Sequence, residues 1–244
     1  MPCLLILGAT SAIAQAVARD AAAQGWRLVL LARQPARLEA IAADLLVRGA
    51  AGVECHAHDL VTGDAAAIAP LLLAGGPPDR ILIAHGVLGD VADHLADPAL
   101  AAANINANLT SPVAWTLALL ALLPPGRACA LGIIGSVAGD RGRASNLVYG
   151  AAKAGLEAFC EGLRHRLAGT PIHIMLIKPG PVDTPMTAHM PKGGLMWSTP
   201  DRVAVDIERG FGRGRAVVYS PGFWRWIMLV IRHLPRAVLH RTKL

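Results

Sequence analysis

The chain has 244 residues, 54% of them hydrophobic, and a formal net charge of +6 at pH 7. This length suits one domain of ordinary size that can bury a sizeable core. The positive charge is not accompanied by a nucleic-acid recognition motif or a basic helix on a polar background, so we predict no nucleic-acid partner. The last acidic residue is Glu208, and eight lysines and arginines follow from Arg209 onward. The net charge therefore comes from the C-terminal end.

The cysteines and the apolar start of the chain bear on its location. The cysteines have no metal-like spacing, so we predict buried thiols in a reducing cytoplasm and no metal site; they are Cys3, Cys55, Cys129 and Cys160. The apolar start lacks the basic leading segment of a signal peptide, and its removal would delete the loop described next. We therefore expect a cytoplasmic protein.

Residues 3–7 form a short apolar run that predicts a buried parallel strand. Gly8 and an alanine-rich helical stretch at 15–24 follow it. A strand, a tight turn and a helix N-terminus together hold a dinucleotide pyrophosphate, because backbone N–H groups and the helix dipole face the anion. Ala12 and Ala14 stand where such loops usually have two more glycines. Because this pattern is common in α/β proteins, the loop alone leaves the question open.

The next predicted strand, 27–32, is followed by Arg33 and, four residues later, Arg37. A site that prefers NAD usually offers an acidic residue at this position, whereas arginine accommodates the 2′-phosphate of NADP. We therefore favour NADP(H), with NAD(H) as the alternative. Both arginines could also be solvated charges at the start of a helix.

Apolar runs alternate with helical patterns along the whole chain. This alternation predicts a single α/β domain with a Rossmann-type, doubly wound parallel sheet of about seven strands and helices on both faces. The longest helices are expected near 99–122 and 147–168. The strands are expected at 3–7, 27–32, 52–57, 80–84, 128–135, 172–177 and 215–219.

Tyr149 and Lys153 are four residues apart in the predicted helix 147–168, and Ser136 precedes them. Side chains at i and i+4 share one face of a helix. A free phenol has a pKa of about 10, and a nearby ammonium favours the phenolate, so we expect Lys153 to lower the pKa of Tyr149. A serine hydroxyl can hydrogen-bond a carbonyl or alcohol oxygen. These residues predict ketone reduction or alcohol oxidation, although a coincidental surface pair would have the same spacing.

The chain resembles the short-chain dehydrogenase/reductase family in segments that follow one another in the family's order. They are Gly8–Ala14, Asp59-Leu60, Ala84-His85-Gly86, Asn108, Ser136, Tyr149, Lys153 and Pro179–Thr184. His85 departs from the family's common Asn-Ala-Gly. The resemblance implies that Tyr149 is the general acid/base, that Ser136 orients the carbonyl and that Lys153 lowers the tyrosine pKa and binds the nicotinamide ribose. It also implies that Asn108 supports a proton-relay water.

The same resemblance implies a set of cofactor-binding residues, with Asp59 at the adenine and 179–184 at the nicotinamide. They are Gly8, Thr10, Ser11, Ala12, Ile13, Arg33, Asp59, Leu60, Ala84, His85, Gly86, Tyr149, Lys153, Pro179, Gly180, Val182 and Thr184.

A closer resemblance is to the decaprenylphosphoryl-2-keto-erythro-pentose reductase subgroup, whose members reduce a keto sugar on a polyprenyl phosphate. It is carried by residues 86–90, 139–149, 186–190 and 232–236. We therefore expect a polyprenyl-linked keto sugar as substrate, with a small soluble ketone or sugar as the alternative. A cofactor-binding sensor without catalysis is a third reading, supported only by His85 and the two missing glycines.

Two segments complete the expected organisation. Residues 184–198 contain prolines and glycines and predict a lid over the substrate within a catalytic domain, 1–222. Residues 223–244 form a basic, aromatic tail in which Pro235 predicts two short helices. The spacing of Arg225, Arg232, Arg236 and Lys243 would make one helical face basic. The apolar run there is shorter than the roughly 20 residues that span a bilayer. The tail suits either the inner membrane surface or a subunit interface, since family members are usually dimers or tetramers.

Overall fold

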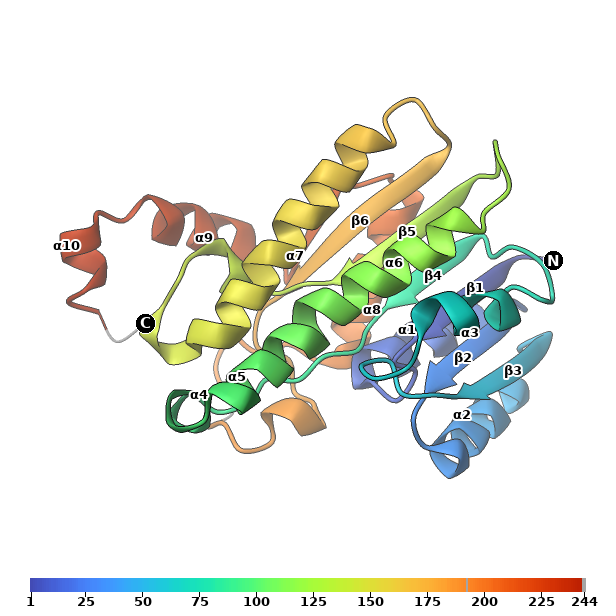
Figure 1. Ribbon diagram of the computed structural model, residues 1–244, viewed down its shortest axis with the longest axis horizontal. Helices are drawn as coiled ribbons and strands as arrows, with labels where there is room; N and C mark the ends of the chain where they lie inside the picture. The colour runs from blue at the N-terminus through green and yellow to red at the C-terminus, as the bar shows by residue number, and fades with distance from the viewer. Residues whose placement is uncertain (192, 243–244) are drawn as a thin grey trace.

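The computed structural model describes residues 1–191 and 193–242. Within these residues, seven strands form one parallel sheet in the order β3-β2-β1-β4-β5-β6-β7 (Figure 1). The strands are β1 (Cys3–Leu7), β2 (Arg27–Ala32), β3 (Gly52–Ala57), β4 (Arg80–Ile83), β5 (Cys129–Ile134), β6 (Ile172–Pro179) and β7 (Val217–Ser220). This confirms the predicted doubly wound α/β fold.

Helices cover both faces of the sheet and bury two separate cores. One face carries α1 (Ala12–Ala23), α2 (Pro35–Val47) and α8 (Pro200–Gly212), and the other carries α3 (Ala65–Leu72), α6 (Ser111–Ala121) and α7 (Leu147–Arg166). Successive strand residues point to opposite faces. In β1, Leu4 and Ile6 join the first core, whereas Leu5 and Leu7 join the second. A central strand buried on both faces must be apolar throughout, which explains the continuous run at 3–7.

Several strand ends differ from the predicted bounds. Strand β6 continues two residues further than expected, because Pro179 pairs with Ser220 of β7. Strand β7 starts at Val217 rather than at 215, because its pairing with β6 begins there, opposite Leu176. Strand β4 ends one residue earlier than predicted, and β5 is one residue shorter at each end.

The helix predicted at 99–122 is interrupted. Helix α5 (Pro98–Ile105) passes into one π-helical turn, Asn106–Thr110, and then into α6. A short helix that was not predicted, α4 (Val91–Ala96), precedes them. π-Turns inside helices frequently lie at functional sites, and this one contains Asn108.

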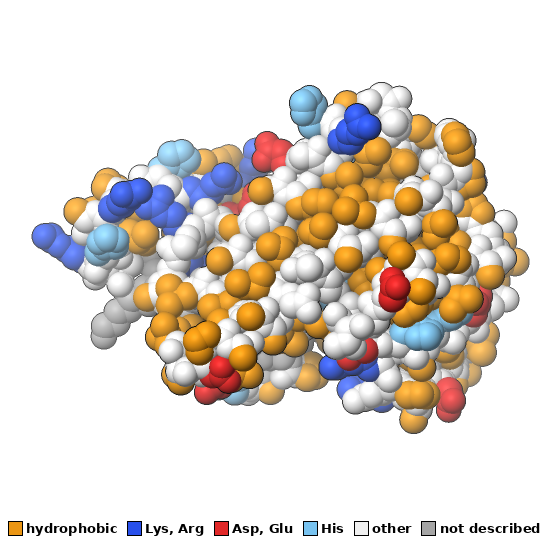
Figure 2. Space-filling model, in the orientation of Figure 1, with side chains coloured by type: hydrophobic (Ala, Val, Ile, Leu, Met, Phe, Trp, Pro, Cys, Tyr) orange, Lys and Arg blue, Asp and Glu red, His pale blue; other side chains and the backbone are white. Residues whose placement is uncertain are grey.

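The C-terminal tail forms α9 (Trp224–His233) and α10 (Arg236–Leu239), on either side of Pro235 as predicted. One side of α9 packs on the domain, where Trp224, Met228 and Ile231 are buried with Val137. The basic side chains of this region gather at one end of the molecule (Figure 2). Lys243, which we included in the basic face, lies outside the described residues.

The prediction that all cysteines are buried is wrong for one of them. Cys3, Cys129 and Cys160 are buried, but Cys55 is exposed. Cys55 belongs to β3, the edge strand of the sheet, which has a neighbouring strand on one side only.

None of the helices in the described part of the chain combines the length and the apolar character needed to cross a membrane.

Candidate active site

A cavity of about 960 Å³ opens at the carboxyl ends of β1, β4, β5 and β6. The sheet continues with β2 and β3 on one side of β1 and with β4 to β7 on the other, and ligands of open α/β sheets bind where the strand order switches in this way. Every catalytic and cofactor-binding residue named from the sequence lines this cavity. Segments that are far apart in the chain thus meet in one place.

Gly8 forms the floor of the cavity directly after β1. Its φ of +87° lies in the region that favours glycine, and a Cβ there would come within 2.7 Å of the His85 nitrogen and 2.9 Å of the His85 Cα. The amide of Gly8 donates to the carbonyl of Leu31 over 2.8 Å. Glycine is therefore needed both for the turn and for the close approach of two backbones.

Helix α1 begins at this cavity. Ser11 is its N-cap residue, yet the Ser11 side chain makes no capping hydrogen bond. The first amides of a helix have no partner within it, and the positive end of the helix dipole favours an anion. Ser11, Ala12 and Ile13 line the cavity at this end. The arrangement fits a pyrophosphate, although Ala12 carries a Cβ where a glycine would leave more room.

Arg33 and Asp59 lie together at the adenine end implied by the resemblance. Arg33 Nη1 is 3.7 Å from Asp59 Oδ2. Burial alone would raise the pKa of Asp59, but amide donors from Val61 and Thr62 and the Arg33 guanidinium lower it. Arg33 remains largely exposed, and so it can contact an anion while it pairs with Asp59.

His85 has a neutral ring in this structure. Burial, helped by the charge of Lys153, lowers the pKa of His85 to about 3. Its Nε2 lies 2.8 Å from the Ser111 hydroxyl, which itself donates to the carbonyl of Leu60. The hydroxyl must then accept from Nε2–H, which leaves Nδ1 as a bare acceptor. That Nδ1 is buried and has no hydrogen-bond partner among the described residues.

Asn108 lies in the π-turn, and several hydrogen bonds fix its side-chain amide. Its Nδ2 donates to the carbonyls of Val87 (2.7 Å) and Asn104 (3.0 Å), and its Oδ1 accepts from the amide of Val87. A Cβ on Gly86 would approach Asn108 Oδ1 to 2.6 Å. The loop after β4 is thus tied to the helix through a fully buried amide.

Ser136, Tyr149 and Lys153 meet at the carboxyl end of β5. The Ser136 hydroxyl accepts from the amide of Ala138 at the start of a 3₁₀ turn, Val137–Asp140. Lys153 is almost completely buried on α7, and its Nζ donates to the carbonyl of Ile134 over 2.9 Å. That Nζ lies 5.6 Å from the centre of the Tyr149 ring.

The expected lowering of the tyrosine pKa does not occur in this structure. Burial raises the pKa of Tyr149, and its contact with the Ser136 hydroxyl only partly offsets the rise. Burial also lowers the pKa of Lys153 to about 8. The hydrogen bond of Lys153 goes to the Ile134 carbonyl rather than to the phenol. In this structure the pair is therefore a neutral phenol beside an ammonium whose pKa is lowered by burial.

Sequence reasoning did not place several residues that line the cavity. Arg143 and Asn146 come from the loop before α7, and Trp224 comes from α9. Each has a buried nitrogen or oxygen without a hydrogen-bond partner in the described chain. The only available signal was the position of 141–146 between Ser136 and Tyr149; nothing local predicted that Trp224 would reach the site.

The predicted lid, 184–198, is an excursion closed at its base by a bridge between Val182 and Ser198. Met186, Thr187 and Met190 line the cavity from this segment. Residue 192 of the lid lies outside the described residues.

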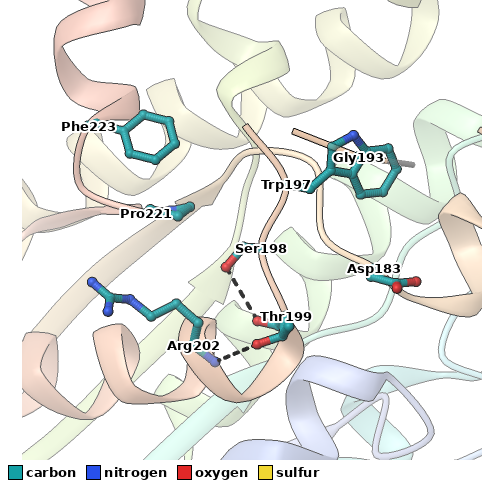
Figure 3. Close-up of a pocket in the computed structure, with 8 residues that line it drawn as sticks. All are labelled: Asp183, Gly193, Trp197, Ser198, Thr199, Arg202, Pro221 and Phe223. Atoms are coloured by element: carbon teal, nitrogen blue, oxygen red, sulfur yellow. Dashed lines mark hydrogen bonds between the residues drawn. The ribbon is translucent and has the colours of Figure 1, made fainter. Parts of the chain in front are cut away.

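A second cavity of about 690 Å³ is lined in part by Gly193, Trp197 and Ser198 of the lid. Figure 3 shows the rings of Trp197 and Phe223 on opposite sides of it, with Thr199 and Arg202 at the start of α8. Of the predicted segments, only 179–184, through Asp183, and the lid contribute to it. The catalytic side chains therefore belong to the larger cavity alone.

The comparisons with known proteins agree with this geometry. A sequence model of the family described as short chain dehydrogenase matches residues 2–193. An uncharacterized oxidoreductase of Streptomyces coelicolor is 38% identical over 242 residues, which cover 98% of this chain and 94% of the relative. A sulfoacetaldehyde reductase of Chromohalobacter salexigens is 33% identical over 195 residues, which cover 76% of this chain and 74% of the relative.

Among solved structures, a short-chain dehydrogenase from Sphingobium yanoikuyae in complex with NADPH superposes with a TM-score of 0.80. It is 25% identical, and the match covers 97% of this chain and 98% of that one. The chain therefore belongs to the short-chain dehydrogenase/reductase family, whose members are oxidoreductases that bind nicotinamide cofactors.

Proposed function

We propose that the protein is an NADP(H)-dependent ketoreductase that interconverts a ketone and a secondary alcohol. The observation that carries this proposal is the meeting of Ser136, Tyr149 and buried Lys153 in the cavity that also contains the Gly8 turn. When bound, the reduced nicotinamide supplies a hydride to a carbonyl carbon. Gly8, the start of α1 and residues 179–184 would hold the cofactor.

The side chains of the site supply the proton and the orientation. Tyr149 donates its phenolic proton to the carbonyl oxygen, for which a neutral phenol is the required form. Ser136 donates a hydrogen bond to the same oxygen and so polarises the carbonyl. Lys153 and Asn108 position this pair, because each is buried and hydrogen-bonded to a backbone carbonyl.

The preference for NADP(H) is supported by charge. Arg33 and Arg37 both line the cavity, where a 2′-phosphate would meet two guanidinium groups. The similar Sphingobium protein was solved with NADPH. NAD(H) is the weaker candidate, because the acidic residue at hand, Asp59, already pairs with Arg33.

For the substrate, we favour a keto sugar on a polyprenyl phosphate. Met186 and Met190 give the lid side of the cavity an adaptable apolar lining. The adjoining tail exposes Trp226, Leu229 and Val230 beside basic residues, which suits the inner surface of a membrane and a lipid-borne substrate. We therefore treat 223–244 as a membrane-contacting tail of the catalytic domain, 1–222. A small soluble carbonyl compound is the second candidate, since one relative is named a sulfoacetaldehyde reductase.

The proposal is tested by NADPH oxidation with a lipid-linked keto-pentose beside a soluble analogue. We expect turnover that falls by roughly 10²–10⁴-fold in Tyr149→Phe, which is the typical contribution of general acid catalysis. NADPH binding should stay within about twofold. Substantial turnover in that variant would refute the role of Tyr149. NADPH binding without oxidation by any ketone would instead favour a sensor.

A further inference from the structure

Arg143 stands out among the partly buried arginines of this protein. Arg27 and Arg80 are similarly enclosed, and they pair with Glu54 and Glu208. Arg143 has no carboxylate partner among the described residues, and its Nε is buried without a hydrogen bond. Burial lowers the pKa of Arg143, and no neighbouring charge offsets this cost. An unpaired buried charge is unfavourable unless a ligand supplies the opposite charge.

The loop that carries Arg143 is fixed so that this side chain meets the cavity. Two residues earlier, Arg141 donates to the carbonyls of Arg232 and Leu234 and thereby ties the loop to α9. Figure 1 shows the loop between the start of α7 and α9. Arg143 itself lines the catalytic cavity, together with Ser136 and Tyr149.

A second unpartnered donor lies in the same cavity. The Trp224 ring packs against Gly180, where a Cβ would collide with Nε1, and this Nε1 is buried without an acceptor. Guanidinium and indole N–H groups can only donate hydrogen bonds. Two such donors from separate elements call for a ligand with oxygen acceptors and negative charge.

The phosphates of the cofactor do not account for these donors. Its phosphates would be held at Gly8, α1 and Arg33, which follow β1 and β2 in the sheet. Arg143 instead follows β5, and Trp224 follows β7, on the side where the substrate must approach Tyr149.

We propose that Arg143, with the indole N–H of Trp224, binds an anionic oxygen group of the substrate beside the carbonyl that is reduced. This rests on the proposed ketoreductase function. The group is a phosphate or a carboxylate, both of which a guanidinium can bind with two parallel hydrogen bonds.

The test is isothermal titration of the full-length, NADP⁺-loaded protein with matched ketones. Dihydroxyacetone phosphate is compared with dihydroxyacetone, and acetoacetate with acetoacetamide, so that the two pairs separate phosphate from carboxylate. We expect at least one anionic compound to bind tenfold or more tightly than its neutral partner. Arg143→Gln should reduce that preference to about one, and Arg143→Lys should restore part of it.

Arg166→Gln is the matched control, because it removes the same charge from an exposed position in the last turn of α7. It should keep the preference for the anion. Arg143→Gln should also melt at the same temperature as the wild type or higher, since it removes an unpaired charge, whereas loss of a structural arginine would lower the melting temperature.

Equal or unmeasurable binding of both compounds in each pair, or a preference that survives Arg143→Gln, would overturn the proposal. NADPH oxidation is measured separately with the same four ketones. Anion preference without reduction of any ketone would count against the ketoreductase function and leave the anion site standing. Reduction of the neutral and anionic ketones with equal efficiency would support the ketoreductase function and count against the anion site.

Discussion

The phenol of Tyr149 holds its proton more tightly than a phenol in water, because burial raises its pKa. At neutral pH the group is therefore ready to donate a proton, as reduction of a ketone requires, rather than to accept one from an alcohol. Lys153 is buried as well, and its lowered pKa shows that the site stabilises the ammonium poorly. At the scale of single residues, desolvation outweighs the attraction between the two charged forms that their spacing indicated.

His85 should make the protein sensitive to acid. Its folded pKa of about 3 lies below the ordinary 6.5, so the unfolded chain takes up a proton first as the pH falls. Above pH 6.5 this difference in pKa leaves the free energy of unfolding unchanged. As the pH falls from 6.5 to 3, the free energy of unfolding decreases. At pH 5 the loss is about 2 kcal/mol, or roughly 5 °C in melting temperature.

Thermal unfolding at pH 7 and pH 5 checks this expectation. The difference between the two melting temperatures should shrink in His85→Ala and stay unchanged in His165→Ala, which alters an exposed histidine. Equal acid sensitivity of wild type and His85→Ala would show that His85 is not responsible.

At the scale of elements, the turn between β1 and α1 depends on one backbone position. Gly8→Ala places a Cβ against the His85 backbone at a positive φ, so we expect a loss of about 2–4 kcal/mol and NADPH binding at least tenfold weaker. Gly25→Ala is the matched control, because its φ is also positive but nothing lies within 4 Å of the new Cβ. It should cost only about 1 kcal/mol and leave NADPH binding intact. Similar effects of both variants on NADPH binding would contradict the role of the close approach.

The tail helix α9 has two faces with different uses. Its buried face, with Trp224 and Met228, packs in the core against Val137. Removal of residues 223–244 would expose Val137, so a loss of membrane binding could not be separated from a loss of folding. The exposed face carries Trp226, Leu229 and Val230 at helical spacing. Surface substitutions therefore test membrane contact more cleanly than truncation.

Sedimentation with vesicles that contain phosphatidylglycerol measures this contact. We expect binding that weakens at high salt and falls about tenfold in Trp226→Ser combined with Val230→Ser, because apolar burial and basic charge act together. Val47→Ser removes an even more exposed apolar group, from α2, and should have no effect. Wild-type protein that stays in the supernatant at low salt would rule out the membrane role.

At the scale of the whole molecule, apolar side chains remain exposed on one face. Figure 2 shows hydrophobic side chains gathered over α6 and α7. Leu117 of α6 and Leu147 of α7 are exposed. Large exposed apolar patches mark interaction sites. We propose that a second copy of the chain covers this face in a dimer or tetramer.

Light scattering after gel filtration checks the assembly. The mass should be two or four times the 25.4 kDa of one chain, and Leu117→Glu should give monomers. Leu46→Glu on α2 places the same charge on a different face and should leave the assembly intact. A monomeric wild type at micromolar concentration would contradict this arrangement.

Much of this protein could be predicted from its sequence because the relevant signals are local. The apolar run at 3–7 indicated a strand buried on both faces, and the i, i+4 spacing of Tyr149 and Lys153 placed them on one side of a helix. The order of such segments predicted the parallel sheet. In the structure, the predicted site residues line one cavity.

Other properties depend on neighbours that are distant in the chain, and only the tertiary structure decided them. The direction of the Tyr149 pKa follows from burial, which no spacing reports. Cys55 is exposed because β3 is the edge strand, and Trp224 reaches the catalytic cavity because α9 folds back onto Val137. Local patterns set which elements form, whereas desolvation and long-range packing set what each side chain can do.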